Sequence, residues 1–340
     1  MRHIRVSDED MKSQLNERPG AAERRGVFWR KPGVWVPLTL LSVALWGTAF
    51  PGVKFGYQLF QIDSSSSGAI SSLLLFAGLR FMIAGLLTLI VTGVIEKRVP
   101  WPKGKAGNWG DIALLGVFQT ILQYSFFFIS MSNTTGATGS ILSSTTAFMA
   151  VVLGSFFFAN DRMDRNKTIG CLLGLAGVIV LNVNPFSPVE LGFRLNGEGL
   201  MLLSALSGAI ANVLSKKMTE RNQPMLLSGW QFLLGGLVLF LFGFLTGGRL
   251  NAVSPAAWAL LLYLGALSAT AFSLWTIMLK YHPLSRLSIF KALIPVVGTI
   301  GSGLILHESI LELHYAAALL LVVLGIIILN RAPREDIDVL

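Results

Sequence analysis

Long apolar runs alternate with short polar connections from residue 34 to residue 330. A membrane-spanning helix needs about 20 mostly apolar residues, and ten runs have roughly this length. The connections between them are too short to hold a soluble domain. The pattern therefore predicts an all-α, polytopic membrane protein with ten transmembrane helices, at 34–58, 72–95, 111–131, 137–158, 167–184, 198–216, 225–246, 255–279, 287–306 and 313–330.

Two of these runs share an unusual plan. Residues 287–308 carry one cation, Lys291, and one helix-distorting residue, Pro295, and they stop at an acidic residue. Residues 140–161 also have a polar start, a mixed small and apolar middle and an acidic stop. A pair of unusual hydrophobic segments at matching places in two halves is a sequence pointer to a transporter's binding site.

The two halves echo each other more widely, because LLSVALWG in helix 1 resembles LLSALSG in helix 6. We predict one repeat at 34–184 (TM1–5) and a second at 198–330 (TM6–10). Five helices per repeat is an odd number, so the second repeat must be inverted in the membrane. Inverted repeats are an architecture for alternating access.

The charges indicate how the chain is oriented. Only 13% of the residues are charged, against about 25% in a soluble domain. The net charge of +9 does not indicate a nucleic-acid partner, because the basic residues stand in short loops between apolar runs. The predicted external loops hold only Arg194 and Arg249, whereas the opposite side is rich in Lys and Arg. The positive-inside rule therefore places both termini in the cytoplasm.

The two ends of the chain are polar. Residues 1–33 are basic and lack the apolar core of a signal peptide, so we interpret them as a disordered cytoplasmic arm. Anionic lipid attracts basic residues next to a membrane helix, but orientation and solubility are the simpler explanation. Residues 331–340 are predicted to form a cytoplasmic tail. The single Cys171 excludes an internal disulfide and a cysteine metal cluster, and we interpret it as a packing residue.

Six segments then carry a family resemblance through their order and spacing: LWGTAFPGVKFG (45–56), LRFMIAGLLTL (79–89), FQTILQYSFFFISMSNTTGATGSIL (118–142), DRMDRNKTIGCLLGLAGVIVLN (161–182), WQFLLGGLVL (230–239) and LKYHPLSRLSIFKALIPVVGTIGSGLILHE (279–308). Together they resemble the drug/metabolite transporter superfamily, in its EamA-like branch of bacterial permeases. The resemblance implies a central cavity lined largely by helices 1, 3, 4, 6, 8 and 9. It also implies export of amino acids, metabolites or toxic organic compounds across the bacterial cytoplasmic (inner) membrane. Many relatives have proline where helix 4 carries Phe148, so a bend in helix 4 is not expected.

Arg80 is the deepest candidate for a substrate-binding residue. It lies roughly 12 Å inside the second run at 1.5 Å per residue. An ionisable residue within a bilayer costs about 3 kcal/mol on insertion scales, and it is by default a functional hypothesis. An arginine there would bind a carboxylate or phosphate through paired hydrogen bonds. Alternatively, it caps backbone carbonyls or pairs with Glu198 or Glu308 to lock helices together, and this structural role is slightly favoured.

Two lysines are further candidates for substrate binding. Lys291 lies one turn before Pro295, which removes a backbone hydrogen bond and can bend the helix. Lys291 either faces the cavity or extends to the cytoplasmic interface, and the two positions are equally supported. Lys54 follows Trp46 at helical spacing and shares its face. With Pro51 as a second helix-bending residue, Lys54 would line the outer mouth of the cavity, unless it extends to the interface instead.

Uncharged polar residues complete the candidate site. Gln119 and Gln123 share one face of helix 3, and as a pair we expect them to line the cavity. Asn212 and Trp275 can also hydrogen-bond a substrate. For any one of these residues the structural explanation is stronger, because polar side chains hold membrane helices together and tryptophans anchor helices at the interface.

Acidic residues are missing from the middle of the predicted helices. Asp111, Asp161, Glu198 and Glu308 all stand near helix ends, so coupling through a buried carboxylate is not supported. The sequence also contains no metal-ligand cluster, nucleophile–base set or phosphate-binding loop. We therefore expect no metal, no cofactor and no enzymatic activity.

The functional hypothesis is export of a small anionic or zwitterionic metabolite, such as an amino acid, by alternating access. The alternative is efflux of aromatic cationic compounds, which the many Trp and Phe residues permit but the intramembrane cations disfavour. The expected partners are a small-molecule substrate and the lipid bilayer, and a homodimer stays open.

Overall fold

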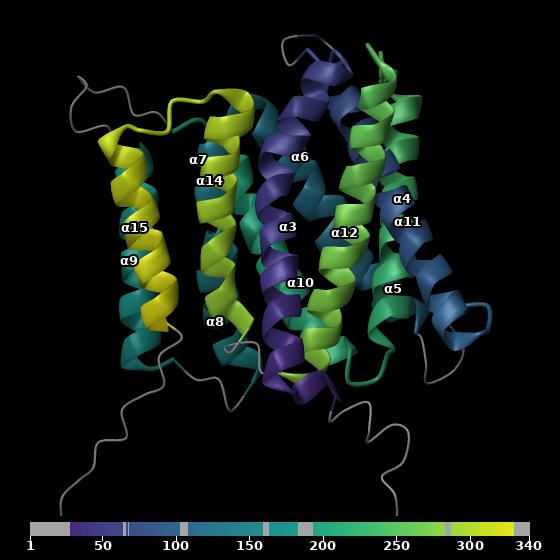
Figure 1. Ribbon diagram of the computed structural model, residues 1–340, viewed down its shortest axis with the longest axis horizontal. Helices are drawn as coiled ribbons and strands as arrows, with labels where there is room; N and C mark the ends of the chain where they lie inside the picture. The colour runs from purple at the N-terminus through teal and green to yellow at the C-terminus, as the bar shows by residue number, and fades with distance from the viewer. Residues whose placement is uncertain are drawn as a thin grey trace, which may run out of the picture.

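The computed structural model describes residues 28–63, 66, 68–102, 108–158, 163–182, 193–282 and 287–329. Much of the predicted arm, the predicted tail and Asp161 lie outside these residues. The described chain forms a bundle of roughly parallel helices (Figure 1). In chain order the elements are α3 (Pro32–Leu59), α4 (Ala69–Glu96), α5 (Trp109–Gly116), η2 (Val117–Leu122), α6 (Gln123–Asn133), α7 (Gly136–Ser143), α8 (Thr145–Phe157), α9 (Arg165–Asn182), η4 (Leu195–Gly199), α10 (Leu200–Met218), α11 (Pro224–Leu245), α12 (Pro255–Tyr281), η5 (Ile289–Ala292), α14 (Leu293–Leu306) and α15 (Leu313–Leu329).

The fold is that of a polytopic, all-α membrane protein. Within the described residues, seven helical stretches are long and apolar enough to cross a membrane. The helices α9, η5–α14 and α15 are shorter and pack beside them. The exact number of ten crossings therefore stays a prediction. The seven stretches are Pro32–Leu59, Ala69–Glu96, Trp109–Asn133, Gly136–Phe157, Leu195–Met218, Pro224–Leu245 and Pro255–Tyr281.

Large apolar side chains cover the outside of the bundle, whereas many polar groups are buried inside it. Phe156 and Leu245 are 79% and 78% exposed. Gln231, Ser268 and Arg80 are almost completely buried. A soluble protein rarely exposes so many large apolar side chains unless a partner protein or a membrane covers them. This distribution fits a bundle with lipid outside and polar contacts between its helices.

The helices of the two halves pair in a symmetric manner. In the first half α3 packs against α12 and α14 of the second, and α10 of the second half packs against α6 and the α7–α8 stretch of the first. The remaining pairs, α4 with α11 and α9 with α15, each join equivalent helices. Exchanging the two halves leaves this set of contacts unchanged, as expected if one repeat is a copy of the other.

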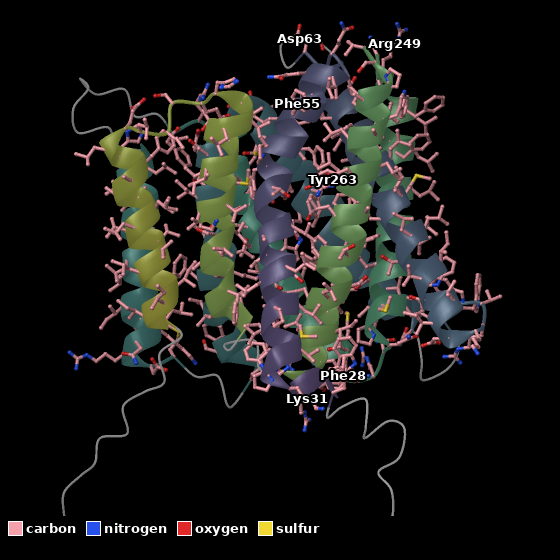
Figure 2. The ribbon with its side chains drawn as sticks, in the orientation of Figure 1. Phe28, Lys31, Phe55, Asp63, Arg249 and Tyr263 are labelled. Carbon is pink, nitrogen blue, oxygen red and sulfur yellow. The ribbon has the colours of Figure 1, made fainter. Side chains whose placement is uncertain are left out.

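The chain directions agree with the predicted inversion. Lys31 and Asp63, which flank α3, lie at opposite ends of the bundle (Figure 2). Arg249 follows α11 and lies at the same end as Asp63, so α3 and α11 run in the same direction. A short turn joins α10 to α11. Helix α10, the first of the second half, therefore runs opposite to α3.

Helix 4 of the chain is interrupted at Ser144, between α7 and α8, although no proline stands there. Each hydroxyl of Ser143, Ser144, Thr145 and Thr146 donates to the carbonyl three residues earlier, at 2.5–3.0 Å. Such bonds from side chain to backbone compete with the helical pattern and bend helices. Consecutive serine and threonine residues thus accompany the interruption at Ser144, and whether helix 4 bends there stays a prediction.

Glycines allow the backbones of α4 and α11 to approach closely. A methyl group added at Gly236 would lie 2.7 Å from the backbone nitrogen of Met82, and one at Gly85 would lie 2.5 Å from that of Leu233. Both distances are well inside van der Waals contact. Small residues at such positions are a common means of packing membrane helices. The seam between α4 and α11 therefore depends on the absence of side chains at these glycines.

We predict that Gly236→Ala lowers the stability of the protein by about 1–3 kcal/mol, because the added methyl forces the α4 and α11 backbones apart. Thermal unfolding in detergent measures the change. The matched control is Gly33→Ala in α3, where an added methyl meets nothing within 4 Å and alanine favours the helix by up to about 1 kcal/mol. Equal unfolding temperatures for the two variants would contradict the close approach.

Candidate functional site

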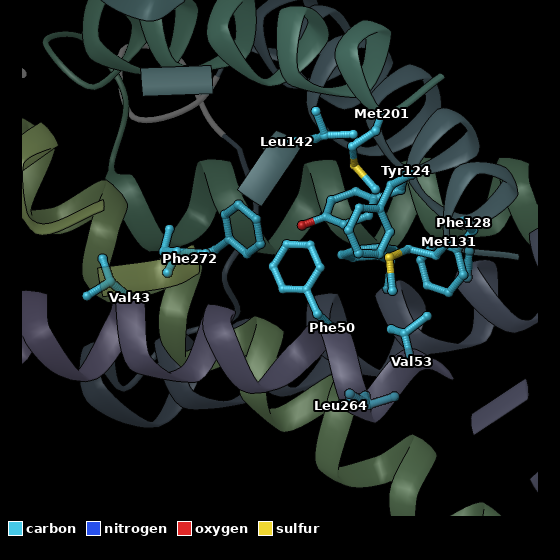
Figure 3. Close-up of a cluster of buried hydrophobic side chains, with 14 of the residues drawn as sticks. Val43, Phe50, Val53, Tyr124, Phe128, Met131, Leu142, Met201, Leu264 and Phe272 are labelled. Carbon is cyan, nitrogen blue, oxygen red and sulfur yellow. The ribbon is translucent and has the colours of Figure 1, made fainter. Parts of the chain in front are cut away.

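A cavity of about 100 Å³ lies in the middle of the bundle, between the two halves. Its wall combines aromatic rings with hydroxyl and amide groups, and it includes two cations and no carboxylate. Rings from three separate elements, Phe50, Tyr124 and Phe272, belong to the buried cluster at this place (Figure 3). The lining residues are Trp46, Ala49, Phe50, Arg80, Gln119, Gln123, Tyr124, Phe127, Ser143, Ser144, Thr146, Ala147, Ser204, Ala205, Gly208, Asn212, Phe272, Lys291 and Ile294.

Arg80 reaches the cavity from α4 and is only 1% exposed. Its Nε donates a hydrogen bond of 3.1 Å to Ser268 Oγ on α12. The guanidinium carbon lies 5.3 Å from the ring centre of Phe81 and 5.9 Å from those of Tyr124 and Phe128. The Nη1 atom has no hydrogen-bond partner. Aromatic faces therefore stabilise the cation while part of its hydrogen-bonding capacity stays unused.

The ion pairs considered for Arg80 are not formed within the described residues. Both Glu308 oxygens accept backbone N–H groups of α7, and Glu198 accepts the N–H of Arg194. No backbone carbonyl accepts from Arg80 in the described part of the chain either. The lock expected through these carboxylates or through carbonyls is therefore not formed, and the choice between a structural and a substrate-binding role for Arg80 stays a prediction. Arg80 is placed at the cavity instead.

Lys291 also lies at the cavity. Its side chain is on η5 and is 6% exposed, and Nζ lies 4.7 Å from the ring centre of Trp275 and 6.0 Å from that of Trp46. This position decides between the two equal alternatives, because a lysine that extended to the interface would be exposed. Pro295 lies inside α14 and cannot donate a backbone hydrogen bond to the turn that carries Lys291.

Trp46, Trp275 and Asn212 form a connected group around Lys291. The indole of Trp275 donates to Asn212 Oδ1 at 3.1 Å, and Asn212 Nδ2 donates to the carbonyl of Gly208 at 2.7 Å. Trp275 does not line the cavity itself, but its ring contacts Lys291, which does. Trp46 does line the cavity, but its Nε1 has no partner.

Gln119 and Gln123 are brought to the cavity by a wide helical turn. The backbone N–H of Gln123 bonds to the carbonyl of Phe118, five residues earlier, and such π-turns often occur at functional sites. Two serines of α10 donate to carbonyls of this region, Ser207 to Phe118 at 2.7 Å and Ser204 to Gln123 at 2.8 Å. Within the described residues, the amide of Gln119 makes no hydrogen bond, so it is available at the cavity.

Lys54 is not part of the cavity wall. It shares a face of α3 with Trp46, but at 1.5 Å per residue it lies about 12 Å further along the helix. The side chain is partly buried there, within electrostatic reach of Glu308. Lys54 is therefore not at the cavity itself, and its expected place at the outer mouth stays a prediction. Pro51 lies inside α3, which stays helical through it, so its bending role stays a prediction.

Glu308 forms a clasp between the halves that sequence reasoning missed. One carboxylate oxygen accepts the N–H of Gly136 at 2.8 Å, and the other accepts that of Ala137 at 2.9 Å. Helix N-termini favour anions because their N–H groups and dipole point outward. The clasp joins the segment after α14 to the start of α7, at the end of the bundle that carries Asp63 (Figures 1 and 2). The signal in the sequence was the TTGATG segment, in which Thr135 caps α7.

Two helices carried by opposite halves are thus tied at one end, while a cavity with two basic side chains in its wall lies between the halves. The described residues contain no group of three His, Cys, Asp or Glu side chains that could hold a metal ion. This architecture, a polytopic helical bundle with a central cavity between two inverted units, defines a membrane transport protein.

The chain belongs to the EamA-like transporter family, whose model matches residues 33–183 and 195–331. This confirms the resemblance to EamA-like permeases of the drug/metabolite transporter superfamily. Among curated relatives, an Archaeoglobus fulgidus protein described as an uncharacterized transporter is 26% identical over 87% of this chain and 98% of its own length. An Escherichia coli protein described as a probable amino-acid metabolite efflux pump is 27% identical over 86% of this chain and 92% of its own length. These names indicate a transporter rather than an enzyme.

The fold also occurs in a solved structure. A crystal structure with 18% sequence identity covers 88% of this chain and 96% of its own, with a TM-score of 0.62. At this identity the likeness concerns the fold alone.

We predict that Glu308→Gln opens the Asp63 end of the bundle more often, because the neutral amide replaces at least one charge-assisted hydrogen bond. A loss of about 1.5 kcal/mol shifts the opening equilibrium roughly tenfold. The reporter is Ala205→Cys, a cavity position, in a Cys171→Ser background. Its labelling by a membrane-impermeant maleimide, added on the Asp63 side, should accelerate by that factor.

The matched control for the clasp is Glu312→Gln. Glu312 is half-exposed and contacts only His314, at 3.3 Å, among the ion pairs of the described residues. This variant should label at the rate of the parent protein. If both variants, or neither, accelerated labelling, the clasp would not be what closes this end.

Proposed function

We propose that the protein exports a small anionic or zwitterionic metabolite, an amino acid being one example, across the bacterial inner membrane. The observation that carries the proposal is the cavity with the buried Arg80 and Lys291 in its wall and no carboxylate beside them. Buried cations without a counter-charge attract an anionic group. Family membership and the efflux-pump relative of Escherichia coli support transport as the function.

In this proposal, the carboxylate of the substrate binds Arg80. Gln119 and Gln123 hydrogen-bond the polar part of the substrate, and Trp46 forms an apolar wall. Lys291 supplies a second positive charge, which Trp275 and Asn212 hold in place.

Alternating access then requires the cavity to open at one end at a time. The Glu308 clasp closes the Asp63 end, which we assign to the outside because Lys31 and most loop cations lie at the opposite end. At that opposite end Lys216 Nζ donates to the carbonyls of Leu279 and His282, at 2.6 and 3.2 Å. The two inverted units would rock against each other, with Pro51 and Pro295 as points where a helix can bend.

Efflux of aromatic cations is less well supported. Its recognition would use the faces of aromatic rings, as cation–π contacts do. At this cavity Lys291 already lies over Trp275 and Trp46, and Arg80 lies over Tyr124. A cationic compound would therefore meet two positive charges at the positions that it needs.

Proteoliposome uptake tests the proposal. The panel contains amino acids, sugar phosphates and cationic dyes, each run with and without a pH gradient. We expect saturable uptake of at least one anionic or zwitterionic solute and none of the dyes. Arg80→Ala should lower the apparent affinity for that solute while the amount of folded protein in the vesicles stays comparable.

The same assay can overturn the proposal. Uptake of the dyes alone would favour the cationic alternative. Unchanged affinity in a poorly expressed Arg80→Ala protein would make Arg80 a structural residue, and a lipid product without solute uptake would point to an enzyme.

A further inference from the structure

Some hydrogen-bond donors at the cavity are buried and unused. Two buried atoms in its wall have no partner, Arg80 Nη1 and Trp46 Nε1, and both are donors. Buried polar groups are normally paired. Both side chains therefore keep a donor for which the described residues provide no acceptor. Carboxylate oxygens are the strongest acceptors for such groups.

No carboxylate lines the cavity, and three carboxylates of the described residues are engaged elsewhere. Glu308 binds two N–H groups of α7, and Glu198 binds that of Arg194. Asp111 accepts from Arg221 and Asn222. Within the described residues, no carboxylate therefore lies beside the two basic side chains in the cavity wall.

The remaining acceptors in the wall determine what an ammonium group would meet there. The Asn212 oxygen is used by Trp275, so the neutral amides of Gln119 and Gln123 are the remaining side-chain carbonyl acceptors in the described wall. Both cations of the wall would repel the ammonium, and in a site of low dielectric that repulsion is stronger than in water. Neutral amides compensate such a charge poorly.

The rings in the wall connect the two cations. Trp46 lies 4.9 Å from Phe272, and Phe272 lies 6.3 Å from Tyr124, measured between ring centres. Lys291 lies over Trp46, and Arg80 lies over Tyr124. An occupant would thus place its anionic group on the donors and its carbon skeleton against these rings.

We infer that the cavity selects organic acids that lack an ammonium group, such as 2-hydroxy acids, over the amino acids of the same skeleton. This inference rests on the proposed function and narrows its substrate class. The wall offers two basic side chains to a carboxylate, whereas an ammonium group would meet only uncharged acceptors beside those same side chains.

Compounds that share one carbon skeleton but differ in charge test the inference. Each set contains an amino acid, its 2-hydroxy analogue and its amide, for the alanine, leucine and phenylalanine skeletons at about pH 6, where a free α-amino group is protonated. The hydroxy acid is anionic, the amino acid is zwitterionic and the amino-acid amide is cationic. Binding is measured on the purified full-length protein in detergent by ligand-dependent thermal stabilisation, which rises with ligand concentration relative to Kd. Counterflow in proteoliposomes then shows whether the bound compounds move.

We expect at least one 2-hydroxy acid to bind tenfold or more tightly than its amino acid, and no amino-acid amide to bind. Arg80→Gln should weaken binding of the hydroxy acid at least tenfold and abolish its preference over the amino acid. Because Arg80→Gln can fail to fold, Lys291→Gln is the second variant, and it should reduce the preference as well. Lys217→Gln, an exposed lysine of α10, is the control and should keep the wild-type preference.

The outcomes separate this inference from the proposed function. If the amino acids bind as well as or better than the hydroxy acids and move in counterflow, charge selection is wrong while export of a zwitterion stands. A cavity that binds no hydroxy acid at millimolar concentration also overturns the inference. If neither this series nor the wider panel of solutes moves across the membrane, the proposed function fails.

Discussion

Two cations, Arg80 and Lys291, are buried between the halves of the bundle without a carboxylate beside them, and much of the surrounding structure serves to hold them there. Burying a charge is costly unless other groups take the place of water. Aromatic faces do this for both cations, and the hydroxyl of Ser268 adds one hydrogen bond to Arg80. Since Arg80 comes from α4 and Ser268 from α12, this contact also joins the two halves.

The cavity exists because three helices depart from regular geometry, each by a different chemical means. Consecutive hydroxyl side chains interrupt the helix at Ser144, a wide turn ends at Gln123, and a proline follows the turn that holds Lys291. In every case a backbone group loses its regular partner, and in the first two cases a serine or threonine hydroxyl bonds a carbonyl of the distorted segment. Hydroxyl groups are suited to this because they satisfy the backbone without adding charge to the interior.

The fold was largely predictable from the sequence. Long apolar runs mark the segments that lie in lipid, and charged loops mark the segments that lie in water, so both can be found without knowing the contacts between helices. The site was predictable in part. Arg80 and Lys291 could be found because an ion within an apolar run is conspicuous, and the glutamine pair could be found from its spacing. Lys54 lies outside the cavity wall, which spacing could not indicate, because spacing predicts the face of a helix but not the depth of a side chain in the bundle. The Glu308 clasp and the interruption at Ser144 depend on side-chain conformations and on contacts between distant segments, which no local pattern contains.

The glycine seam between α4 and α11 restricts how the two halves can move. A shift of one helix along the other would bring side chains onto the glycine positions, where the backbones leave no room even for a methyl group. Translation along the seam is therefore blocked over the length that the glycines cover, whereas a small tilt about it keeps the same atoms in contact. The seam would then act as a pivot, and the helices furthest from it would travel the greatest distance during each cycle.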